Sequence, residues 1–534
     1  MGPGTTSALA GGLGGGPCGW LGWWPLTGDS GFRLAQLLRD HAAVHPDSPA
    51  LICDGRTETY EALDRRSNRI AQYLHSSGVG AGDRVAHLDR NSSGGAELLF
   101  ACAKIGAALV PLNWRLATPE LVKLLGDAGA EILFCGPQFA GQAAELVEEL
   151  PRLRELVVLE PGDDAWLADC PGQDPLADGG SDAVVLQLYT SGTTGLPKGV
   201  QTTNANLSLL ASSVAEQWSI DASSVSLVAM PLFHIGGMGW LLVGLANRAC
   251  NVLVAEIEPR SLLDTLERER ITNAFLVPTV LQMLAAVPGA AARDWSALRS
   301  IAYGASSITT PVLKAVLSTF GCELYQVYGM TETTGAIVQL AAADHDPGGP
   351  REHLLRSAGK PYPWMELEIV DPRSGEPVAV GEVGEVRVRG ASVTPGYFAN
   401  PAETAAAIDG DGWLRTGDGG YLNQAGYLFL TDRIKDMIVT GAENVYPAEV
   451  EEVLAQHPGV VEVAVFGVPD ERWGEIVTAA VVAGAGEVSA QELVGFARER
   501  LAGYKLPRRV HLVPELPKTA TGKISKKDLR ARFG

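Results

Sequence analysis

Short apolar segments alternate with helical segments through the middle of the chain, and this alternation restricts the folds open to it. Ala183–Leu188 and Leu298–Tyr303 have the length and character of strands buried on both faces. Residues 58–78 carry apolar positions at helical spacing. Thr310-Pro311 begins a further helix, which Gly321 ends. The pattern predicts an α/β fold with largely parallel strands.

The alternation of strands and helices ends near residue 365. Short strand-like segments separated by Gly, Pro and Asp follow and predict a small β subdomain. A last unit of strands and helices follows Asp432. At 534 residues the chain is too long for one core. We therefore expect three parts: a flexible extension (1–31), a large N-terminal domain of α/β subdomains with the small β subdomain (32–434), and a mobile α+β C-terminal domain (435–534).

Charge and cysteine content exclude several partners. The net charge is −20, which disfavours nucleic acid and anionic lipid and requires local positive groups around any phosphate. No segment reaches the roughly 18 apolar residues of a membrane span, so we expect no integral membrane association. The 7 cysteines form no CxxC pair, which is typical of a reducing cytoplasm.

The segment Leu188–Val200 has the composition of a polyphosphate site. It follows a predicted buried strand and carries a cluster of hydroxyls, two glycines and Lys198. Glycines let backbone N–H groups approach an anion, and hydroxyls add donors. Lys198 follows Pro197, so this is not a Walker A loop. Taken alone, the segment has a solvated Gly/Ser/Thr turn as its less favoured alternative.

Other nucleotide and catalytic patterns are weak or missing. A GxGxxG pattern at Gly14–Gly19 has no strand before it, so it lacks the context of a dinucleotide site. The sequence contains no GxSxG and no HExxH, which leaves esterase and zinc-protease chemistry without its nucleophile or ligands.

With its neighbours in the chain, this loop resembles the signature of the adenylate-forming superfamily, in the branch of the acyl-CoA synthetases. Seven more motifs of that family follow in the expected order, so the resemblance covers residues 32–534. They begin at Pro231, Tyr303, Tyr328, Trp413, Asp432, Gly441 and Pro517.

The resemblance implies a site for ATP and Mg²⁺. The β- and γ-phosphates would lie on Thr190, Ser191, Gly192, Thr193, Thr194, Gly195 and Lys198. The adenine slot would be formed by Gly304, Ala305, Ser306, Tyr328 and Gly329. Thr331 would contact the α-phosphate, Glu332 would bind Mg²⁺, and Asp418 with Arg433 would hold the ribose. Lys523 would bridge the substrate carboxylate and the α-phosphate, which makes Lys523, Glu332, Thr331 and Thr190 the expected catalytic residues.

The family carries out two half-reactions with two placements of its C-terminal domain. Lys435 matches the hinge, and the loop from Gly441 to Tyr446 would line the coenzyme A tunnel. Position 442 is Ala where the family commonly has Gly. Trp473, Tyr504 and Lys505 could bind the coenzyme A nucleotide or serve only as ordinary packing and surface charge.

The identity of the acid is partly constrained. Phe233 is followed by His234 rather than Asp, and a buried ammonium without a carboxylate would be costly, so an amino acid is disfavoured. The residues expected at the acid are His234, Gly236, Gly237, Gly335 and Ala336. Their small size suits a medium or long apolar chain, but it could equally reflect close backbone packing. His234 could border the acid or be a core histidine.

We therefore expect an AMP-forming acid–thiol ligase that converts a fatty acid to its acyl-AMP and then to its coenzyme A thioester. The alternative is a ligase that loads an aryl or other acid onto a carrier protein. A catalytically silent nucleotide-binding relative is disfavoured by the presence of Glu332, Asp418 and Lys523. The sequence does not indicate the oligomeric state.

Overall fold

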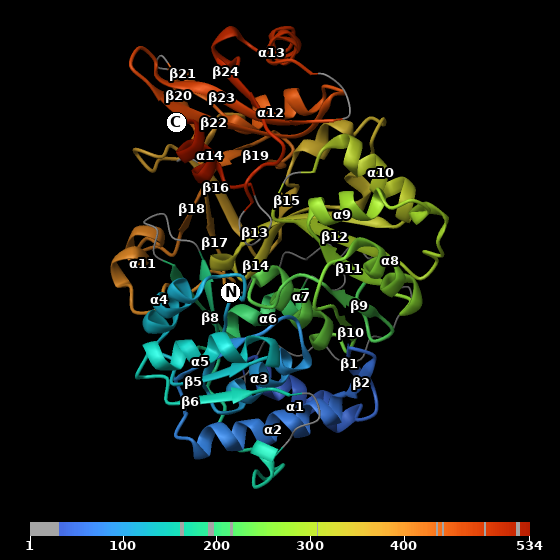
Figure 1. Cartoon of the computed structure of the whole chain (residues 1–534), viewed down its shortest axis with the longest axis vertical. Coiled ribbons are helices and arrows are strands. Elements are labelled where there is room, and N and C mark those ends of the chain that lie inside the picture. The colour runs from blue at the N-terminus through green and yellow to red at the C-terminus, as the bar shows by residue number, and fades with distance from the viewer. Residues whose placement is uncertain are drawn as a thin grey trace, which may run out of the picture. The chain divides into compact units, whose positions relative to one another are not determined.

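The structure is a computed structural model that describes residues 31–160, 165–190, 197–213, 217–306, 308–433, 436–440, 443–484, 488–518 and 524–534. Phe32–Gly534 forms one unit of mutually contacting residues. Four sheets carry the architecture, and Figure 1 shows the helices arranged around them.

The first sheet contains six strands. Their spatial order is β6 (Glu155–Val158), β5 (Ile132–Cys135), β3 (Arg84–Leu88), β4 (Ala108–Pro111), β7 (Val184–Thr190) and β8 (Lys198–Thr203). The first five run parallel, and β8 is antiparallel to β7. Strands β4 and β5 are buried along their whole length, as strands covered on both faces should be. The helices of this region are α2 (Tyr60–Ser76), α3 (Ser93–Lys104), α4 (Thr118–Ala128) and α5 (Ala140–Glu149).

The second sheet contains nine strands. Their spatial order is β15 (Lys360–Pro361), β14 (Gly335–Leu340), β13 (Glu323–Met330), β12 (Ser300–Gly304), β11 (Asn273–Leu276), β9 (Val225–Val228), β10 (Cys250–Leu253), β1 (Pro49–Cys53) and β2 (Arg56–Thr59). From β13 to β1 all neighbours are parallel, and antiparallel strands form both edges. The α/β prediction with largely parallel strands is confirmed.

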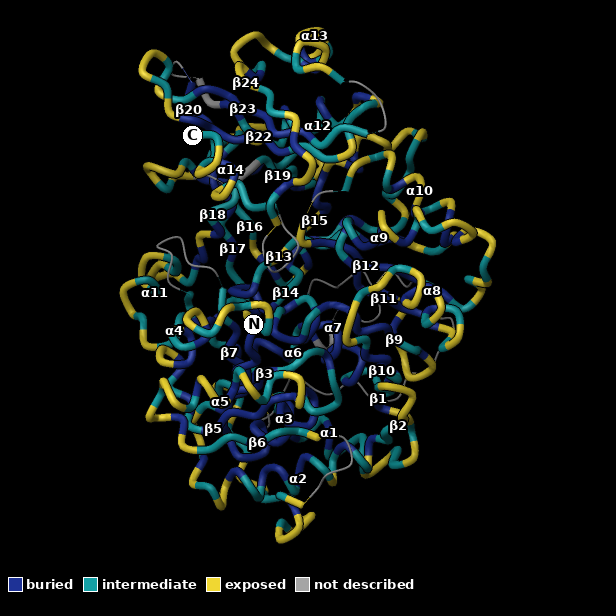
Figure 2. The backbone as a smooth tube through the Cα atoms, in the orientation of Figure 1, coloured by how far each residue is buried: buried dark blue, intermediate teal, exposed yellow. Residues whose placement is uncertain are grey.

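Two helices connect these sheets. Helix α7 (Ile235–Ala246) is buried over nearly its whole length and contacts β9, β10, β11 and β14 of the second sheet. Helix α6 (Asn204–Ser213) contacts both α7 and β8. Figure 2 shows the buried backbone running along the strands of both sheets and along α7. The remaining helices of this region are α1 (Leu34–Val44), α8 (Pro259–Arg268), α9 (Pro278–Ala285) and α10 (Thr310–Phe320).

The expected small β subdomain is an antiparallel sheet of β16 (Glu366–Val370), β17 (Gly384–Arg389), β18 (Leu414–Leu422) and β19 (Leu428–Arg433). Helix α11 (Pro401–Ala407) lies between β17 and β18 in the chain. Its N-cap is Asn400, whose side chain accepts a hydrogen bond of 3.2 Å from the backbone N–H of Glu403. This cap fixes Glu403 in the first turn of the helix.

The C-terminal region has its own sheet and its own cores. The sheet contains β20 (Ile438–Thr440), β21 (Glu443–Val445), β22 (Val460–Asp470), β23 (Gly474–Ala483) and β24 (Arg509–Leu512). One apolar cluster joins it to α12 (Pro447–Ala455) and α13 (Ala490–Arg498). A separate cluster joins it to α14 (Lys526–Phe533), which agrees with an independently packed unit. Within the described residues, no helix combines the length and the apolar character needed to cross a bilayer.

Local capping explains where the predicted and observed boundaries differ. Helix α2 begins at Tyr60 rather than Glu58, because the Thr59 hydroxyl accepts a hydrogen bond of 3.2 Å from the N–H of Ala62. Gly321 ends α10 as predicted, with a left-handed φ of 61°. Strand β7 runs on to Thr190, beyond the predicted end at Leu188, because the hairpin with β8 continues its pairing.

Candidate functional site

The predicted phosphate loop connects two paired strands. Thr190 ends β7 and lies directly opposite Lys198, the first residue of β8. The pairing of β7 with β8 thus holds the two ends of the loop opposite each other. The predicted phosphate-binding residues between them lie outside the described residues: Ser191, Gly192, Thr193, Thr194 and Gly195.

Lys198 is held by two residues that were not predicted from the sequence. Its ammonium forms an ion pair with the carboxylate of Glu403, and its Nζ lies 4.9 Å from the centre of the Tyr397 ring. The side chain of Lys198 is only 12% exposed. The carboxylate and the ring face together hold the ammonium of Lys198 at this place.

Glu332 lies on the other side of the same tyrosine. It sits in a 3-10 turn (Thr331–Thr333) directly after β13 and is 6% exposed. The Tyr397 hydroxyl donates a hydrogen bond of 3.1 Å to Oε1 of Glu332. The backbone carbonyl of Glu332 accepts one of 2.8 Å from the N–H of Thr394. Thr331, the predicted α-phosphate contact, is also buried.

A second pair joins the predicted adenine and ribose residues. The Tyr328 hydroxyl, from β13, donates a hydrogen bond of 2.7 Å to Oδ2 of Asp418, from β18. Asp418 also lies opposite Arg433 in the β18–β19 pair, although the side chain of Arg433 is outside the described residues. The structure therefore brings together residues about 90 positions apart that the sequence analysis had assigned to one nucleotide.

The predicted adenine loop follows β12 and needs small residues. A Cβ at Gly304 would lie 2.4 Å from the carbonyl oxygen of Val327, so no larger residue fits there. A Cβ at Gly329 would lie 1.9 Å from the carbonyl oxygen of Gly335. Ala305 has a left-handed φ of 69°, and both Ala305 and Ser306 are exposed. The chain thus turns sharply out of the sheet at this point.

A titratable pair lies just before this loop. The Tyr303 hydroxyl and Nε2 of His345 are 2.9 Å apart, and Nδ1 of His345 lies 2.9 Å from the carbonyl oxygen of Ala341. Burial lowers the pKa of His345 and raises the pKa of Tyr303. A neutral imidazole that donates from Nδ1 and accepts the tyrosine proton at Nε2 satisfies both contacts.

The residues predicted at the acid lie around the start of α7. His234 is the N-cap of α7, and its Nδ1 accepts a hydrogen bond of 3.2 Å from the N–H of Gly236. A Cβ at Gly237 would lie 2.2 Å from the carbonyl oxygen of Pro231, so this glycine is required by backbone packing. A Cβ at Gly335 would make only ordinary contacts, at 3.6 Å or more, with Leu210 and Ile235. Ala336 follows Gly335 in β14.

Three predicted site residues of the C-terminal part cannot be placed. The hinge residue Lys435, the tunnel residue Gly441 and the catalytic lysine Lys523 all lie outside the described residues.

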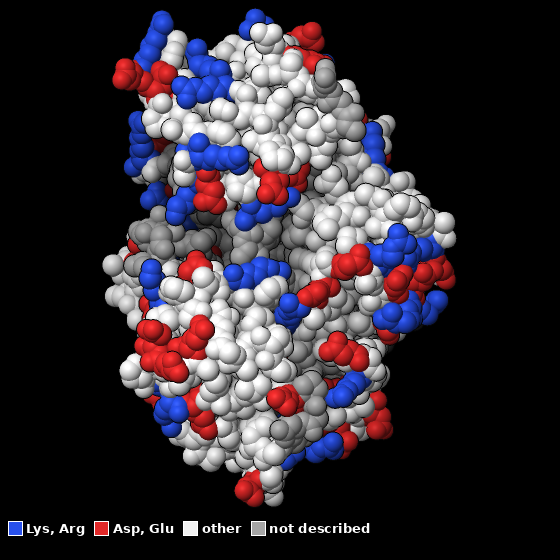
Figure 3. Space-filling model, viewed as in Figure 1, with Lys and Arg blue, Asp and Glu red and all other residues white. Residues whose placement is uncertain are grey.

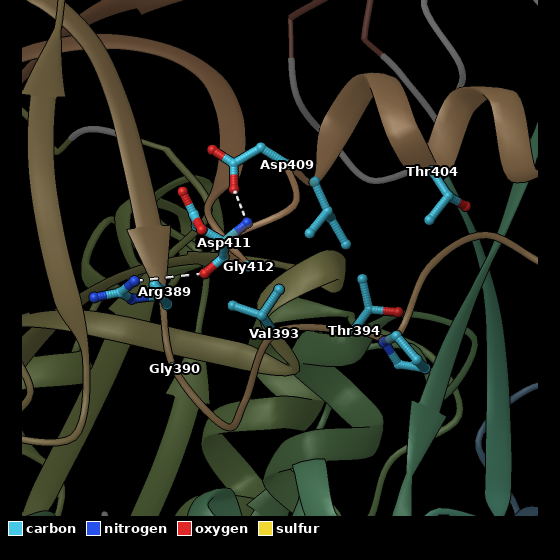
Figure 4. A pocket seen from close by; sticks show the side chains of 10 residues that line it. Arg389, Gly390, Val393, Thr394, Thr404, Asp409, Asp411 and Gly412 are labelled. Carbon is cyan, nitrogen blue, oxygen red and sulfur yellow. Dashed lines mark hydrogen bonds between the residues drawn. The ribbon is translucent and has the colours of Figure 1, made fainter. Parts of the chain in front are cut away.

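A cavity of about 520 Å³ is lined by residues between Arg389 and Gly412, none of which is a predicted site residue (Figure 4). Thr394 lines it and connects it to Glu332 through the backbone hydrogen bond described above. Two of its charged groups are engaged in the fold: Nη2 of Arg389 donates to Oε2 of Glu366 at 2.6 Å, and Asp409 accepts from the backbone N–H of Asp411 and of Trp413. These internal bonds make the cavity a poor site for a charged ligand.

The donor set around Glu332 fits a magnesium ion that is bound mainly through substrate. Mg²⁺ commonly binds one or two carboxylates together with phosphate oxygens. Glu332 supplies one carboxylate, positioned by Tyr397 and close in the fold to the lysine that begins β8. In the described part of the chain, no group of three His, Cys, Asp or Glu side chains forms an all-protein metal site.

Known proteins are similar to this chain over nearly its full length. A fatty acid–[acyl-carrier-protein] ligase of Streptomyces coeruleorubidus is 40% identical over 510 residues, which cover 94% of this chain and 96% of that protein. A feruloyl-CoA synthase of an Amycolatopsis species is 38% identical over 519 residues, covering 96% and 99%. The crystal structure of ATP-bound MatB from Rhodopseudomonas palustris matches with a TM-score of 0.86 at 28% identity, covering 93% of this chain and 99% of that one.

Family models give the same result for both parts of the chain. The model of the AMP-binding enzyme matches residues 38–398, and that of the AMP-binding enzyme C-terminal domain matches residues 449–523. This chain therefore belongs to the family of AMP-binding enzymes.

Proposed function

We propose that this chain uses ATP to convert an apolar carboxylic acid to its acyl-AMP, and then transfers the acyl group to the thiol of coenzyme A. The observation that carries the proposal is the contact of one tyrosine, Tyr397, with both Lys198 and Glu332. A cation for phosphate and a carboxylate for Mg²⁺ are thereby held at one place, which is what a triphosphate site requires.

The nucleotide would extend between the two paired strands and the end of the second sheet. Thr190, the loop after it and Lys198 would bind the β- and γ-phosphates. Tyr328 and the Gly304–Ser306 turn would border the adenine, and Asp418 would accept the ribose hydroxyls. The hydrogen bond from Tyr328 to Asp418 supports this assignment, because it fixes the carboxylate beside the adenine slot.

In the first half-reaction, a carboxylate oxygen of the acid would attack the α-phosphorus of ATP. A new P–O bond forms, the bond to the β-phosphate breaks, and pyrophosphate leaves. Thr331 and Lys523 would stabilise the charge that develops at the α-phosphate. Glu332 would hold Mg²⁺, which would neutralise part of the charge on the triphosphate. Lys198 and the loop would orient the departing pyrophosphate.

In the second half-reaction, the thiolate of coenzyme A would attack the acyl carbonyl, and AMP would leave with the electrons of the carbon–oxygen bond. We propose residues 435–534 as the domain that moves between the two steps, with its hinge at Lys435 and with the Gly441 loop beside the incoming thiol. The separate apolar clusters of the C-terminal sheet support a unit that keeps its own fold while it moves.

The surface of that unit is suited to an anionic acceptor. Two guanidinium groups lie near the ring of Trp473 in this unit. That of Arg508 is 4.3 Å from the ring centre, and that of Arg472 is 5.1 Å from it. Figure 3 shows Lys and Arg side chains gathered on the upper left of the view, where Figure 1 places the C-terminal strands and α14. Lys505 is engaged with Glu449 at 2.6 Å, so we assign it a structural role there.

A carrier-protein thiol is the second candidate acceptor. The fatty acid–[acyl-carrier-protein] ligase of Streptomyces coeruleorubidus, at 40% identity, favours this alternative. Coenzyme A and a carrier protein present the same phosphopantetheine thiol, so the adenylation step is common to both.

We also propose a cytoplasmic location, which the free thiols of the six cysteines in the described residues support.

The test is pyrophosphate release from ATP and Mg²⁺ over a panel of aliphatic, aryl and amino acids, with and without coenzyme A. Release with apolar acids, and AMP with thioester when coenzyme A is present, is the expected result. Formation of ADP, or no release with any acid, would refute the proposal. If adenylation is normal but the thioester forms only on a holo carrier protein, the carrier-protein thiol is the acceptor.

A further inference from the structure

Aromatic side chains lie beside the glycines at which the acid is predicted to bind. This inference rests on the proposed function, because it takes the acid to lie against Gly236 and Gly335. A Cβ at Gly335 would make ordinary contacts with Leu210 from α6 and Ile235 from α7, and a Cβ at Gly236 would lie closer than that to Phe275 from β11.

Trp240 lies one helical turn beyond Gly236. Residues four apart share a face of a helix, and their positions differ by about 6 Å along the axis. Both face the second sheet: a Cβ at Gly236 would lie 2.9 Å from Cε1 of Phe275, and the ring centres of Trp240 and Phe275 are 5.9 Å apart. An acyl group that passes over Gly236 into α7 therefore meets these two rings after a short distance.

The ring of Trp218 packs next to Trp240 as a third aromatic side chain. The centres of Trp218 and Trp240 are 5.2 Å apart, and the planes of both neighbouring ring pairs are tilted by 32°. We call Trp218, Trp240 and Phe275 the aromatic wall. All three side chains are buried, at 3%, 4% and 9% exposure.

Hydrogen bonds prevent the aromatic wall from opening at one end. Nε1 of Trp218 donates a hydrogen bond of 2.7 Å to Oε1 of Gln339, which also accepts one of 2.8 Å from the Tyr362 hydroxyl. The ring of Tyr362 stacks on Trp364 at 4.6 Å. Movement of Trp218 would break this buried arrangement, so the wall behaves as a fixed boundary.

We propose that the aromatic wall closes the acyl site and makes a planar aromatic acid the preferred substrate, with Trp240 as the residue that sets the permitted length. Ring edges and faces at this distance favour a further aromatic ring over a flexible chain. The absence of side chains at Gly236 and Gly335 brings the acid up to the wall, and a medium or long chain would have to displace Trp240. This proposal replaces the medium or long chain expected from the glycines alone with an aromatic acid.

Trp240 is also the most informative position to change. Among the described residues its Nε1 has no hydrogen-bond partner, so replacement strands no polar group, in contrast to Trp218. Trp166 offers a matched control: its Nε1 is equally without a partner in the described part of the chain, and it packs against Tyr73 and Phe134 with ring centres at 5.0 and 5.7 Å. It belongs to the first sheet's surroundings, away from the acid.

The experiment measures kcat/KM for pyrophosphate release with butyrate, cinnamate, octanoate and dodecanoate in wild type, Trp240→Leu and Trp166→Leu. In wild type we expect cinnamate to exceed dodecanoate and butyrate at least about tenfold, in line with hydrophobic-pocket discrimination. Trp240→Leu should raise the dodecanoate-to-cinnamate ratio about tenfold or more, and Trp166→Leu should leave that ratio unchanged.

Three results would overturn the inference: wild type that prefers dodecanoate, wild type that prefers butyrate, or a ratio that does not respond to Trp240→Leu in a folded variant. If the variant does not fold, the wild-type panel decides. Pyrophosphate release with none of the acids would instead reject the proposed function, so the two failures are distinct.

Discussion

The hydroxyl of Tyr397 donates to Oε1 of Glu332 at 3.1 Å, while the face of the same ring lies 4.9 Å from the ammonium of Lys198. One side chain from the loop after β17 therefore orients a buried carboxylate that follows β13 and a cation that begins β8. The relationship joins three segments that are far apart in the sequence, and it places Tyr397 as a positioning residue of the proposed triphosphate site.

Tyr397→Phe should lower kcat/KM for adenylation by about 10- to 150-fold, because a hydrogen bond to a charged group contributes roughly 1.5–3 kcal/mol. The ring face remains for Lys198, so the loss should appear mainly as a higher Mg²⁺ concentration for half-maximal rate. Titration of pyrophosphate release with Mg²⁺ at saturating ATP measures it. Tyr421→Phe, which removes a hydroxyl from a ring stacked on Phe429, is the control and should leave the Mg²⁺ dependence unchanged. An identical Mg²⁺ curve for Tyr397→Phe would contradict the positioning role.

The sequence predicted the local elements well because their signals are local. The Thr-Pro start and the Gly321 end of α10 are set by backbone conformation within one turn. The order of strands in the two large sheets could not be predicted, since pairing such as β1 with β10 depends on contacts about 200 residues apart.

The same limit applies to the candidate site. Asp418 and Glu332 were found because they stand in motifs of a family. Glu403 and Tyr397 carry no such signal on their own, and their roles come only from the ion pair and the contacts that folding creates with Lys198. Small residues were equally ambiguous in sequence: Gly237 packs against carbonyl oxygens, whereas Gly335 meets only side chains at ordinary distances.

Gly237→Ala should destabilise the fold by about 1–3 kcal/mol, because its methyl carbon would lie 2.2 Å from the carbonyl oxygen of Pro231 and the backbone would have to shift. Gly239→Ala is the matched control in the same helix. Its methyl carbon would lie 3.1 Å from Cδ2 of Leu210, which a small side-chain movement relieves, and would make only ordinary contacts with Ile235. Urea unfolding of both variants provides the comparison, and equal stabilities would rule out close backbone packing as the reason for Gly237.

Acidification should weaken the fold through His345. Burial lowers its pKa below the ordinary value near 6.5, so the unfolded chain takes up the proton before the folded chain does. The stabilisation is therefore complete above about pH 6.5 and is lost as pH falls below it. His345→Gln can still accept the Tyr303 proton but does not titrate, so its free energy of unfolding should fall less between pH 7.5 and pH 5.5 than that of wild type. Urea unfolding at both values tests this, and parallel losses would exclude His345 as a contributor.

The two half-reactions should respond differently to the loss of the Lys523 side chain. If this lysine bridges the carboxylate and the α-phosphate only during adenylation, Lys523→Ala should reduce acyl-AMP formation by about 10²–10³-fold, the usual loss for one preorganised donor. Thioester formation from supplied acyl-AMP and coenzyme A should stay close to the wild-type rate, because the proposed rotation of residues 435–534 moves Lys523 away in that step. Lys518→Ala controls for charge in the same segment, since Lys518 forms an ion pair with Glu462 at 2.7 Å. Equal loss of both half-reactions in Lys523→Ala would mean that one arrangement of the C-terminal domain serves both steps.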